Sequence, residues 1–404
     1  MKKVLLNDIT LRITDGKHGD CEPSENSGYY FVSCKDVNNG IIDYENARQI
    51  TEASFQEANK RTLLEPNDIL LTNSGTIGRM ALVKDIPETS RTTFQKSVAI
   101  IKADPKHVLP KYLYYQLQNY VQEFINSSNG SAQKNLLLST MREFELSIHQ
   151  DLKAQKELSD ILSFYDDLIE NNRKQIKLLE EAAQRLYKEW FVDLHFPGYE
   201  TTPIHDGIPE GWEMTILEEL IEFNPKYTVP KAVQKRVFPM SSLSTTSMVL
   251  DYTESSLSIS VSGARFSNGD TLLARITPCL ENGKTAYVDG LQAGEIAMGS
   301  TEFIVMQSKK LNPYMVYLLA RSSDFRKTAI NSMTGSDGRQ RAQVDKLKLF
   351  PYLCPSQSVL DAFERLSKPM FEQIYNLNKQ ILGLTESRDR LLPKLMSGEI
   401  EVKK

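Results

Sequence analysis

The sequence predicts an internally duplicated α/β protein, in which two globular α/β domains are separated by an antiparallel coiled coil of two long helices. Three observations predict this fold. The two halves of the chain repeat each other at a constant spacing, each half passes from a strand-rich segment into helices, and each half ends in a heptad pattern of apolar residues. The 404-residue length suits two domains of ordinary size plus connecting structure. A chain duplicated in this way has pseudo-twofold symmetry.

The repeat is carried by a constant offset of 205 residues, which takes Gly78 to Gly283. At this offset the segment 78–83 resembles 283–288, and matching positions continue as far as Leu186 and Leu391. A single match would mean nothing, but an offset that holds over more than a hundred residues indicates a duplication.

Each copy has the same internal order. In the first copy we expect strands at 29–33, 68–72, 81–83 and 97–101, because short β-branched and aromatic runs there are bounded by turn residues. A helical stretch follows at 112–124, with a counterpart at 314–327, and then a Gly-Ser loop and a long helix. Prolines and glycines mark a linker between the copies. The predicted division is a first domain at 1–150, a long helix at 151–195, a linker at 196–211, a second domain at 212–355 and a second long helix at 356–400.

The long helices carry the strongest periodic signal, since apolar residues repeat every seven positions in two companion rows. One interpretation is two amphipathic helices, each packed on its own domain. A coiled coil is favoured, because the pattern extends over four or five heptads, and the path of the chain requires it to be antiparallel. Pro369 and Pro393 predict that the second helix is kinked or starts late, and frays near its end. The predicted coiled-coil residues are Leu162, Ile169, Ile176, Leu179, Leu186, Ile374, Leu377, Ile381, Leu384 and Leu391.

Composition excludes several classes of protein. The formal net charge of −4 excludes a uniformly basic nucleic-acid binder, although it permits a locally basic face. The four cysteines and five histidines show no metal-ligand spacing, so no metal site is expected. The first residues are too short an apolar run for a signal peptide, and the longest apolar stretch, 314–320, is too short to span a bilayer. We therefore expect a soluble, cytoplasmic protein with reduced thiols.

Catalytic motifs are missing from the sequence. Gly283 and Lys284 lack the leading glycine of a phosphate-binding loop, because position 278 is proline. The segment Asn224-Pro225-Lys226-Tyr227 lacks the second proline of the amino-methyltransferase pocket that it otherwise suggests, and we interpret it as a turn. The sequence predicts neither enzymatic activity nor a cofactor.

Two kinds of loop, present in both copies, contain side chains that could bind a ligand rather than catalyse a reaction. A turn between two predicted strands, 73–79, is rich in small polar side chains that can bond base edges or phosphates, and its arginine can bind guanine or phosphate. The Gly-Ser loops, 129–135 and 335–341, combine glycine with basic residues that suit a phosphate. An ordinary exposed loop, or a solvated basic face, would give the same pattern. The candidate DNA-binding residues are Lys17, His18, Asn73, Ser74, Thr76, Arg79, Gln133, Lys134, Asn135, Lys226, Lys231, Lys235, Arg236, Arg275, Thr277, Asn282, Lys284, Arg339 and Arg341.

The order of these strands, loops and helices, repeated in the two copies, resembles that of the specificity subunits of Type I restriction–modification enzymes. The resemblance covers nearly the whole chain. The segments that carry it are 68–72 running into 78–81, 299–303, 185–191, 208–212 and 395–400. The second Gly-Ser loop departs from the first, with Gly338-Arg339 where the first has Gln133-Lys134, so the two loops correspond only approximately.

The resemblance implies two target-recognition domains that each read one half of a split double-stranded DNA target. The coiled coil would set the gap between the halves and dock two methyltransferase subunits, and nuclease/translocase subunits would join the complex outside them. Catalysis would belong to those partners. Because the first sixty residues of the two copies differ, we expect an asymmetric target. The alternatives are a coiled-coil scaffold protein without DNA readout and an enzyme with an unrecognised site.

Overall fold

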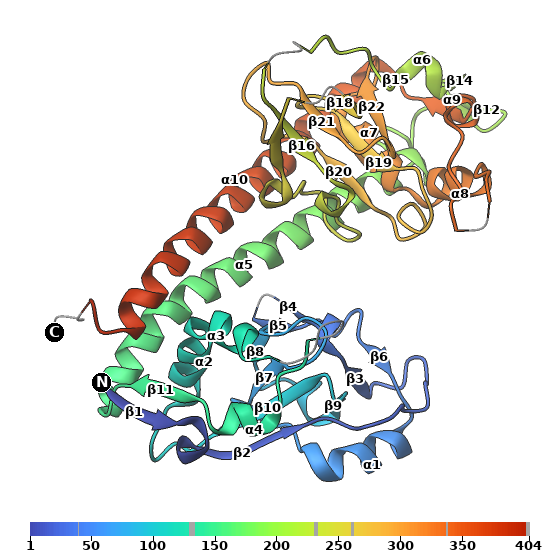
Figure 1. Ribbon diagram of the computed structural model, residues 1–404. Helices are drawn as coiled ribbons and strands as arrows, with labels where there is room; N and C mark the ends of the chain where they lie inside the picture. Colours follow the sequence, from blue (N-terminus) through green and yellow to red (C-terminus); the bar gives the residue numbers. More distant parts are fainter. Residues whose placement is uncertain (39, 129–133, 230–232, 260–261, 337, 401–404) are drawn as a thin grey trace. The chain divides into compact units, whose positions relative to one another are not determined.

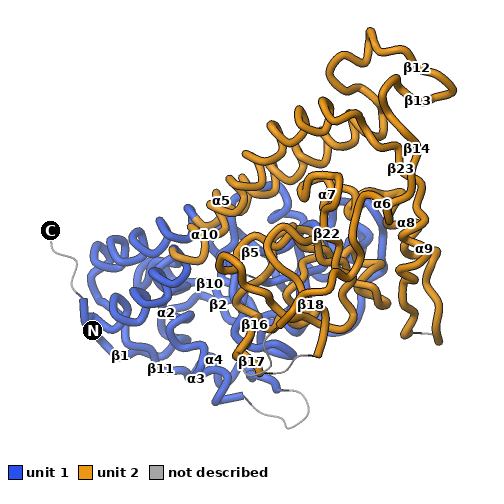
Figure 2. The backbone as a smooth tube through the Cα atoms, turned by 90° about the horizontal axis from the view of Figure 1, so that it is seen from above, with its two compact units in different colours: residues 1–168, 384–404 blue, residues 169–383 orange. Residues whose placement is uncertain are grey.

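The computed structural model describes residues 1–38, 40–128, 134–229, 233–259, 262–336 and 338–400 (Figure 1). The chain forms two compact units (Figure 2). The first contains residues 1–168 together with 384–404, and the second contains residues 169–383. Each unit therefore holds one globular part and one end of each long helix.

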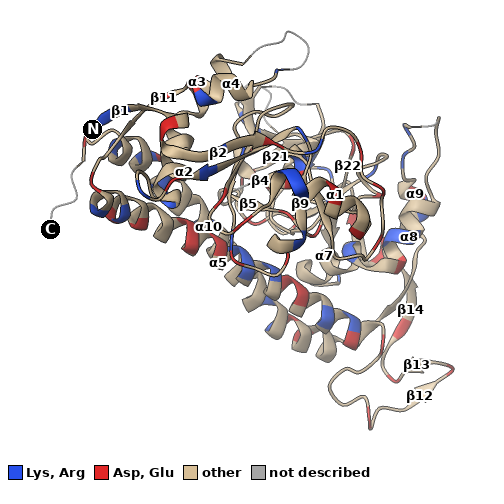
Figure 3. Ribbon diagram, turned by 90° about the horizontal axis from the view of Figure 1, so that it is seen from below, with Lys and Arg blue, Asp and Glu red and all other residues tan. Residues whose placement is uncertain are grey.

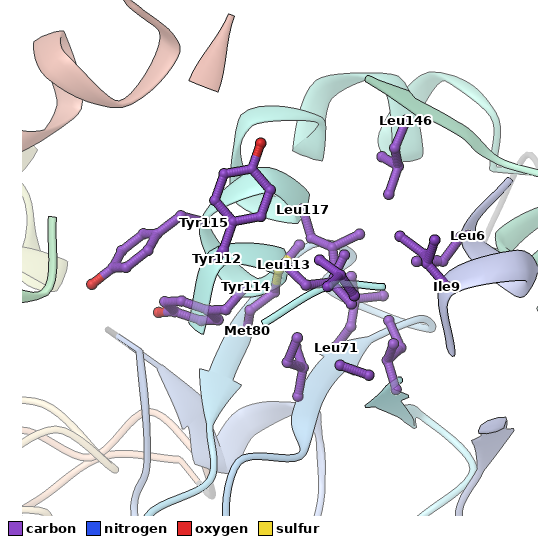
Figure 4. Close-up of a cluster of buried hydrophobic side chains, with 14 of the residues drawn as sticks. Leu6, Ile9, Leu71, Met80, Tyr112, Leu113, Tyr114, Tyr115, Leu117 and Leu146 are labelled. Carbon is purple, nitrogen blue, oxygen red and sulfur yellow. The ribbon is translucent and has the colours of Figure 1, made fainter. Parts of the chain in front are cut away.

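A four-stranded antiparallel sheet forms the centre of the first unit, in the order β2-β10-β7-β8. Every residue of its inner strand β7 is buried, which explains why an unbroken apolar run forms this strand. Side chains from the sheet pack against those of helix α2, among them Leu71, Met80 and Tyr112 (Figure 4). The strands and the helix are β2 (Thr10–Asp15), β7 (Ile69–Thr72), β8 (Met80–Leu82), β10 (Val98–Ala103) and α2 (Pro110–Asn119).

Smaller elements surround this sheet. Strand β3 pairs in parallel with β9 and in antiparallel with β6, and β1 pairs with β11. The remaining elements of the first unit are β1 (Lys2–Leu5), β3 (Tyr30–Val32), β4 (Val37–Asn38), β5 (Ile41–Ile42), β6 (Arg48–Gln49), α1 (Glu52–Thr62), β9 (Thr92–Phe94), α3 (Val121–Asn126), α4 (Leu138–Arg142) and β11 (Glu145–Ile148).

The second unit repeats this arrangement. Its four-stranded sheet has the order β15-β22-β19-β20, and a parallel pair, β16 and β21, again lies in a separate sheet. The predicted duplication is therefore confirmed. The elements are β12 (Ile204–His205), β13 (Ile208–Pro209), β14 (Glu213–Ile216), α6 (Leu217–Leu220), β15 (Ile221–Phe223), β16 (Lys235–Phe238), β17 (Ser256–Ser258), β18 (Ala264–Phe266), β19 (Thr271–Ala274), β20 (Thr285–Tyr287), β21 (Ala297–Gly299), β22 (Phe303–Ser308), α7 (Pro313–Arg321), α8 (Ser323–Asn331), α9 (Val344–Lys348) and β23 (Pro351–Cys354).

Local details differ from the sequence-based expectation. The helical stretches expected at 112–124 and 314–327 are each two helices, α2 with α3 and α7 with α8. In the second copy the break has a clear cause, since the Ser322 hydroxyl accepts the Phe325 amide and begins a new helix. The segment expected as a linker contains a small hairpin, in which β12 pairs with β13.

The two long helices, α5 (Leu152–Phe191) and α10 (Gln357–Met396), pair with each other in both units. In the first unit the Arg388 guanidinium donates to the Asp166 carboxylate at 2.6 Å. In the second unit the Asn172 amide donates to Gln380 at 3.1 Å, and the ring of Phe363 lies 5.7 Å from that of Trp190. Residue numbers rise along α5 where they fall along α10. The helices are therefore antiparallel, as predicted.

The predicted coiled-coil residues are not all buried to the same extent. Leu162, Ile169, Ile176, Ile374, Leu377 and Ile381 are buried. The other four predicted coiled-coil residues, Leu179, Leu186, Leu384 and Leu391, are half-buried.

The helix neither starts late nor frays at Pro393, because α10 is continuous from Gln357 to Met396, and the alternative expectation of a kink stays a prediction. Pro369 and Pro393 are both exposed, so the positions without an N–H face solvent. Between and beyond them, Phe371, Ile374 and Leu395 are buried, and this packing stabilises the helix through both prolines.

We predict that Phe363→Ala destabilises the second unit by about 3 to 5 kcal/mol, because it removes a fully buried ring from the aromatic cluster of Tyr187, Trp190 and Phe191. The two tryptophans of the chain, Trp190 and Trp212, both lie in this region and report urea unfolding by fluorescence. The matched control is Phe164→Ala, since the Phe164 side chain on α5 is 63% exposed and its loss should change stability little. Equal effects of the two substitutions would contradict the helix pairing.

Candidate nucleic-acid interface

In the first unit, the hairpin loop 73–79 between β7 and β8 lies beside the segment that ends the first Gly-Ser loop. Ser74 and Asn135 form an antiparallel bridge, and the Leu136 amide donates to the Asn73 carbonyl at 2.8 Å. The Thr72 hydroxyl closes the hairpin loop, since it donates to the Thr76 carbonyl and accepts the Arg79 amide. Two predicted recognition loops are thus held together.

The side chains of this loop pair differ in accessibility. Asn73 is buried, Ser74 and Asn135 are half-buried, and Thr76, Arg79 and Lys134 are exposed. The candidate Gln133, with the glycine and serine before it, lies outside the described residues.

The second unit has the same juxtaposition. The loop 275–284 between β19 and β20 bridges the second Gly-Ser segment through Ile276 and Arg341, and the Ala342 amide donates to the Arg275 carbonyl at 2.8 Å. The Thr277 hydroxyl donates to the Gln340 carbonyl at 3.3 Å.

Among the remaining candidates of this loop pair, Asn282 and Arg339 are exposed, whereas Arg275 is half-buried. The Lys284 ammonium group donates to the Met240 carbonyl at 3.0 Å, so part of its hydrogen-bonding capacity holds the protein together. The second loop pair is more basic than the first.

Two arginines that sequence reasoning missed support the loop 275–284. Arg321 at the end of α7 donates to the Gly283 carbonyl at 2.8 Å, and Arg326 on α8 donates to the Glu281 carbonyl at 3.1 Å. Burial and the neighbouring Arg321 charge lower the pKa of Arg326. Comparison of the two copies could have indicated them. At the 205-residue offset their counterparts in the first copy are Gln116 and Val121, which carry no charge.

Arg341 is bound by a carboxylate. Its Nε donates to both oxygens of Glu302, at 2.9 and 3.0 Å, and its Nη2 donates to one of them at 2.7 Å. These bonds lower the pKa of Glu302. The pair fixes the orientation of the guanidinium plane.

The basic stretch predicted at 226–236 does not form one continuous charged face. Lys226 is exposed, but Lys235 is buried and donates to the Val233 carbonyl at 2.7 Å. Arg236 lies 3.6 Å from Glu295 and over the ring of Tyr252. Lys231 lies outside the described residues.

The first-copy candidates Lys17 and His18 both have acidic neighbours. Lys17 lies 3.0 Å from Glu57, and His18 lies 2.9 Å from Asp15, which also accepts Arg61. Within the described part of the chain, these ion pairs do not connect the two residues to the hairpin loop 73–79.

Buried aspartates mark equivalent places in the two sheets. Asp68, just before β7, lies 2.6 Å from the Lys102 ammonium group. Asp270, just before β19, instead accepts the Tyr227 hydroxyl at 2.7 Å and the Ser267 amide at 2.9 Å. Burial raises the pKa of both carboxyls, and that of Asp270 reaches about 6. In the described part of the second copy, Asp270 is therefore held by neutral hydrogen-bond donors, whereas Asp68 in the first copy is paired with a lysine.

In the described ranges, no group of three or more histidine, cysteine, aspartate and glutamate side chains could hold a metal ion. Within the same ranges, no helix has the length and apolar character needed to cross a membrane.

Comparison with known proteins identifies the class of protein. The model of the Type I restriction modification DNA specificity domain matches residues 13–181. The Type I restriction enzyme MjaIX specificity subunit of Methanocaldococcus jannaschii is 28% identical over 92% of this chain and 87% of its own length. The EcoAI specificity subunit of Escherichia coli is 37% identical over 33% of this chain and 23% of its own length.

A solved structure shows the same fold over the full length. The S subunit of the Type I restriction–modification system from M. genitalium aligns with 98% of this chain and 95% of its own, with a TM-score of 0.56 and 13% identity. Residues 13–181 therefore match a Type I restriction modification DNA specificity domain, and the chain is similar along most of its length to a Type I restriction enzyme specificity subunit.

We predict that Asp270→Asn reduces the pH dependence of stability. The pKa of Asp270 rises from 3.8 to about 6 on folding because the charged form is buried. The contribution of Asp270 to the free energy of unfolding is therefore greatest below about pH 4, falls by about 3 kcal/mol between about pH 4 and pH 6, and is constant above that range. The difference in urea midpoint between pH 5 and pH 8 should shrink in this variant. Asp345→Asn removes the same charge from an exposed site and serves as control; an unchanged difference for Asp270→Asn would contradict the assignment.

Proposed function

We propose that this chain reads the two halves of a split, asymmetric double-stranded DNA target with two target-recognition domains, residues 1–150 and 212–355. The helix pair, joined to the second domain through the segment 196–211, sets the distance between the two half-sites. The observation that carries this proposal is the loop pair, which occurs in both units at equivalent places in equivalent sheets.

The chemistry of the loop pairs supports DNA as the ligand. The exposed Thr76 and Arg79 supply hydroxyl and guanidinium groups that can bond base edges and phosphates. In the second copy, Arg275 and Arg341 stand where the first copy has Asn73 and Asn135, so the two domains present different side chains to their half-sites. This difference supports an asymmetric target.

We further propose that the chain performs no catalysis, binds no cofactor and acts through partners. Two methyltransferase subunits would dock on the helix pair, and nuclease/translocase subunits would join through the complex. Lysine and arginine alternate with aspartate and glutamate along α5 and α10 (Figure 3). Such mixed surfaces suit protein partners better than DNA, whose phosphates would be repelled by the carboxylates.

Binding experiments separate this function from that of a coiled-coil scaffold without DNA readout. The chain, assembled with methyltransferase subunits, should bind its target duplex with an affinity that falls steeply as salt is added. A flat salt response, or equal affinity for target and scrambled duplexes, would favour the scaffold.

We predict that Arg79→Ala weakens recognition of one half-site only. The Arg79 side chain is exposed beside the loop pair, and its loss should cost about tenfold in affinity, with a salt slope lower by about one if it binds a phosphate. The measurement compares duplexes in which one half-site at a time is scrambled. Arg390→Ala, an exposed arginine on α10, is the charge-matched control. Equal losses at both half-sites would contradict two independent readers.

We also predict that one heptad inserted into each helix beside the Asn172–Gln380 pair lengthens the gap between half-sites. Seven residues add roughly 10 Å of helix, which corresponds to about three base pairs of DNA. Sequencing of methylated bases in a host that carries the variant gives the new gap. A heptad in α5 alone breaks the pairing and should abolish methylation. An unchanged gap in the double insertion would contradict the spacing role.

A further inference from the structure

The ion pair between Arg341 and Glu302 leaves one edge of the guanidinium group available. A guanidinium carries five N–H groups in one plane. The Nε hydrogen and one Nη2 hydrogen face the Glu302 carboxylate. The remaining edge, made of Nη1 and the second Nη2 hydrogen, has no hydrogen-bond partner among the described residues. The Arg341 side chain is 42% exposed.

The backbone of Arg341 is held as firmly as its side chain. Its amide donates to the Thr334 carbonyl at 2.9 Å, and its own carbonyl accepts the Thr334 amide at 3.1 Å. A second bridge joins it to Ile276 in the neighbouring loop. Glu302 is fixed too, since it directly precedes strand β22 and its carbonyl accepts the Arg275 amide at 2.9 Å. These contacts hold both the backbone and the guanidinium group of Arg341 in one orientation.

Such an arrangement suits one ligand better than others. A phosphate can be bound by any mobile cation, and a carboxylate 2.7 Å from the arginine would weaken its attraction to phosphate. Guanine instead presents two acceptors, O6 and N7, in the major groove, and an arginine edge binds both at once. The nearby charge of Glu302 weakens binding to guanine little, because guanine is selected by the direction of the arginine N–H groups rather than by the net charge.

We propose that Arg341 reads a guanine in the half-site bound by the second domain, and that Glu302 is the residue that positions it. This inference rests on the proposed function and deepens it, since it names one base that the second domain recognises. The equivalent bridge position in the first copy is Asn135, which has no charge, so the first domain does not share this contact.

The ion pair would serve a purely structural role if it only joined the Gly-Ser segment to the sheet. The two roles predict different responses to changes in the DNA. A structural pair affects binding to every duplex alike, whereas a guanine reader responds to the atoms of one base.

The test uses the full chain assembled with methyltransferase subunits, after sequencing of methylated bases has given the target. Each guanine of the half-sites is replaced in turn by 7-deazaguanine, which lacks the N7 acceptor, or by hypoxanthine, which keeps N7 and O6 but lacks the amino group. At one position 7-deazaguanine should lower affinity by about 5- to 150-fold, and hypoxanthine should not.

Protein variants assign the effect. In Arg341→Ala the affinities for guanine and 7-deazaguanine at that position should become equal. Glu302→Gln, which keeps the shape but removes the charge, should reduce the ratio of the two affinities while the protein still binds. Arg339→Ala, an exposed arginine of the same loop, should keep the full ratio. Recognition of the other half-site shows that each variant is folded.

The possible outcomes are distinct. If no guanine shows the N7 effect, or if the effect persists in Arg341→Ala, the proposed contact is overturned while DNA recognition stands. If the wild-type complex does not prefer its target over a scrambled duplex, the proposed function itself fails.

Discussion

The antiparallel pairing of α5 and α10 is the constraint on which the rest of the structure depends. The two helices are the same part of a duplicated sequence, and they begin and end at equivalent positions, Leu152 with Gln357 and Phe191 with Met396. Antiparallel pairing brings the start of one against the end of the other. The final turns of α10 therefore complete the core of the first unit, where Leu395 and Met396 pack with other buried residues of that unit. The core of the first unit is therefore built from both ends of the chain.

Each globular part is attached to the helices by side chains that break the heptad rule. In the first unit, Asp166 of α5 binds both Arg388 of α10 and the Tyr115 hydroxyl of α2. Arg388 interrupts an apolar row, and its position is explained by this network. A half-buried polar network of this kind favours one arrangement, because a shift would leave a partly desolvated charge unpaired.

In the second unit the attachment relies more on packing. Phe371 of α10 contacts the rings of Tyr287, Tyr314 and Tyr317, and the buried carboxylate of Glu180 accepts the Ser247 hydroxyl and the Met248 amide. Burial raises the pKa of Glu180, so this contact carries a cost that the aromatic packing offsets. The same fold is therefore joined to the same helices by different chemistry in the two copies.

The sequence predicted the duplication, the sheets and the helix pair because these depend on periodicity and on repeated order. It did not predict the break at Ser322, which depends on one hydroxyl capping a helix, or the continuity of α10 through Pro369. Among the site residues, it named Arg341 but not Glu302, because a contact between a loop and a strand 39 residues away leaves no local pattern. Arg321 and Arg326 were missed for the same reason.

Comparison of the two copies separates features that the fold requires from residues that are free to vary. Where both copies keep a feature, such as the bridge between the two loops, the fold requires it or the shared function does. Where they differ, as at Asn135 and Arg341, the fold tolerates either residue, and the difference is available for specificity. Arg326 and its counterpart Val121 show the limit of this argument, since Arg326 supports a longer loop rather than facing a ligand. A charged residue gained in one copy is a candidate reader only when its donors are not already used by the protein. The outer edge of Arg341, for which the described residues supply no hydrogen-bond partner, meets that condition.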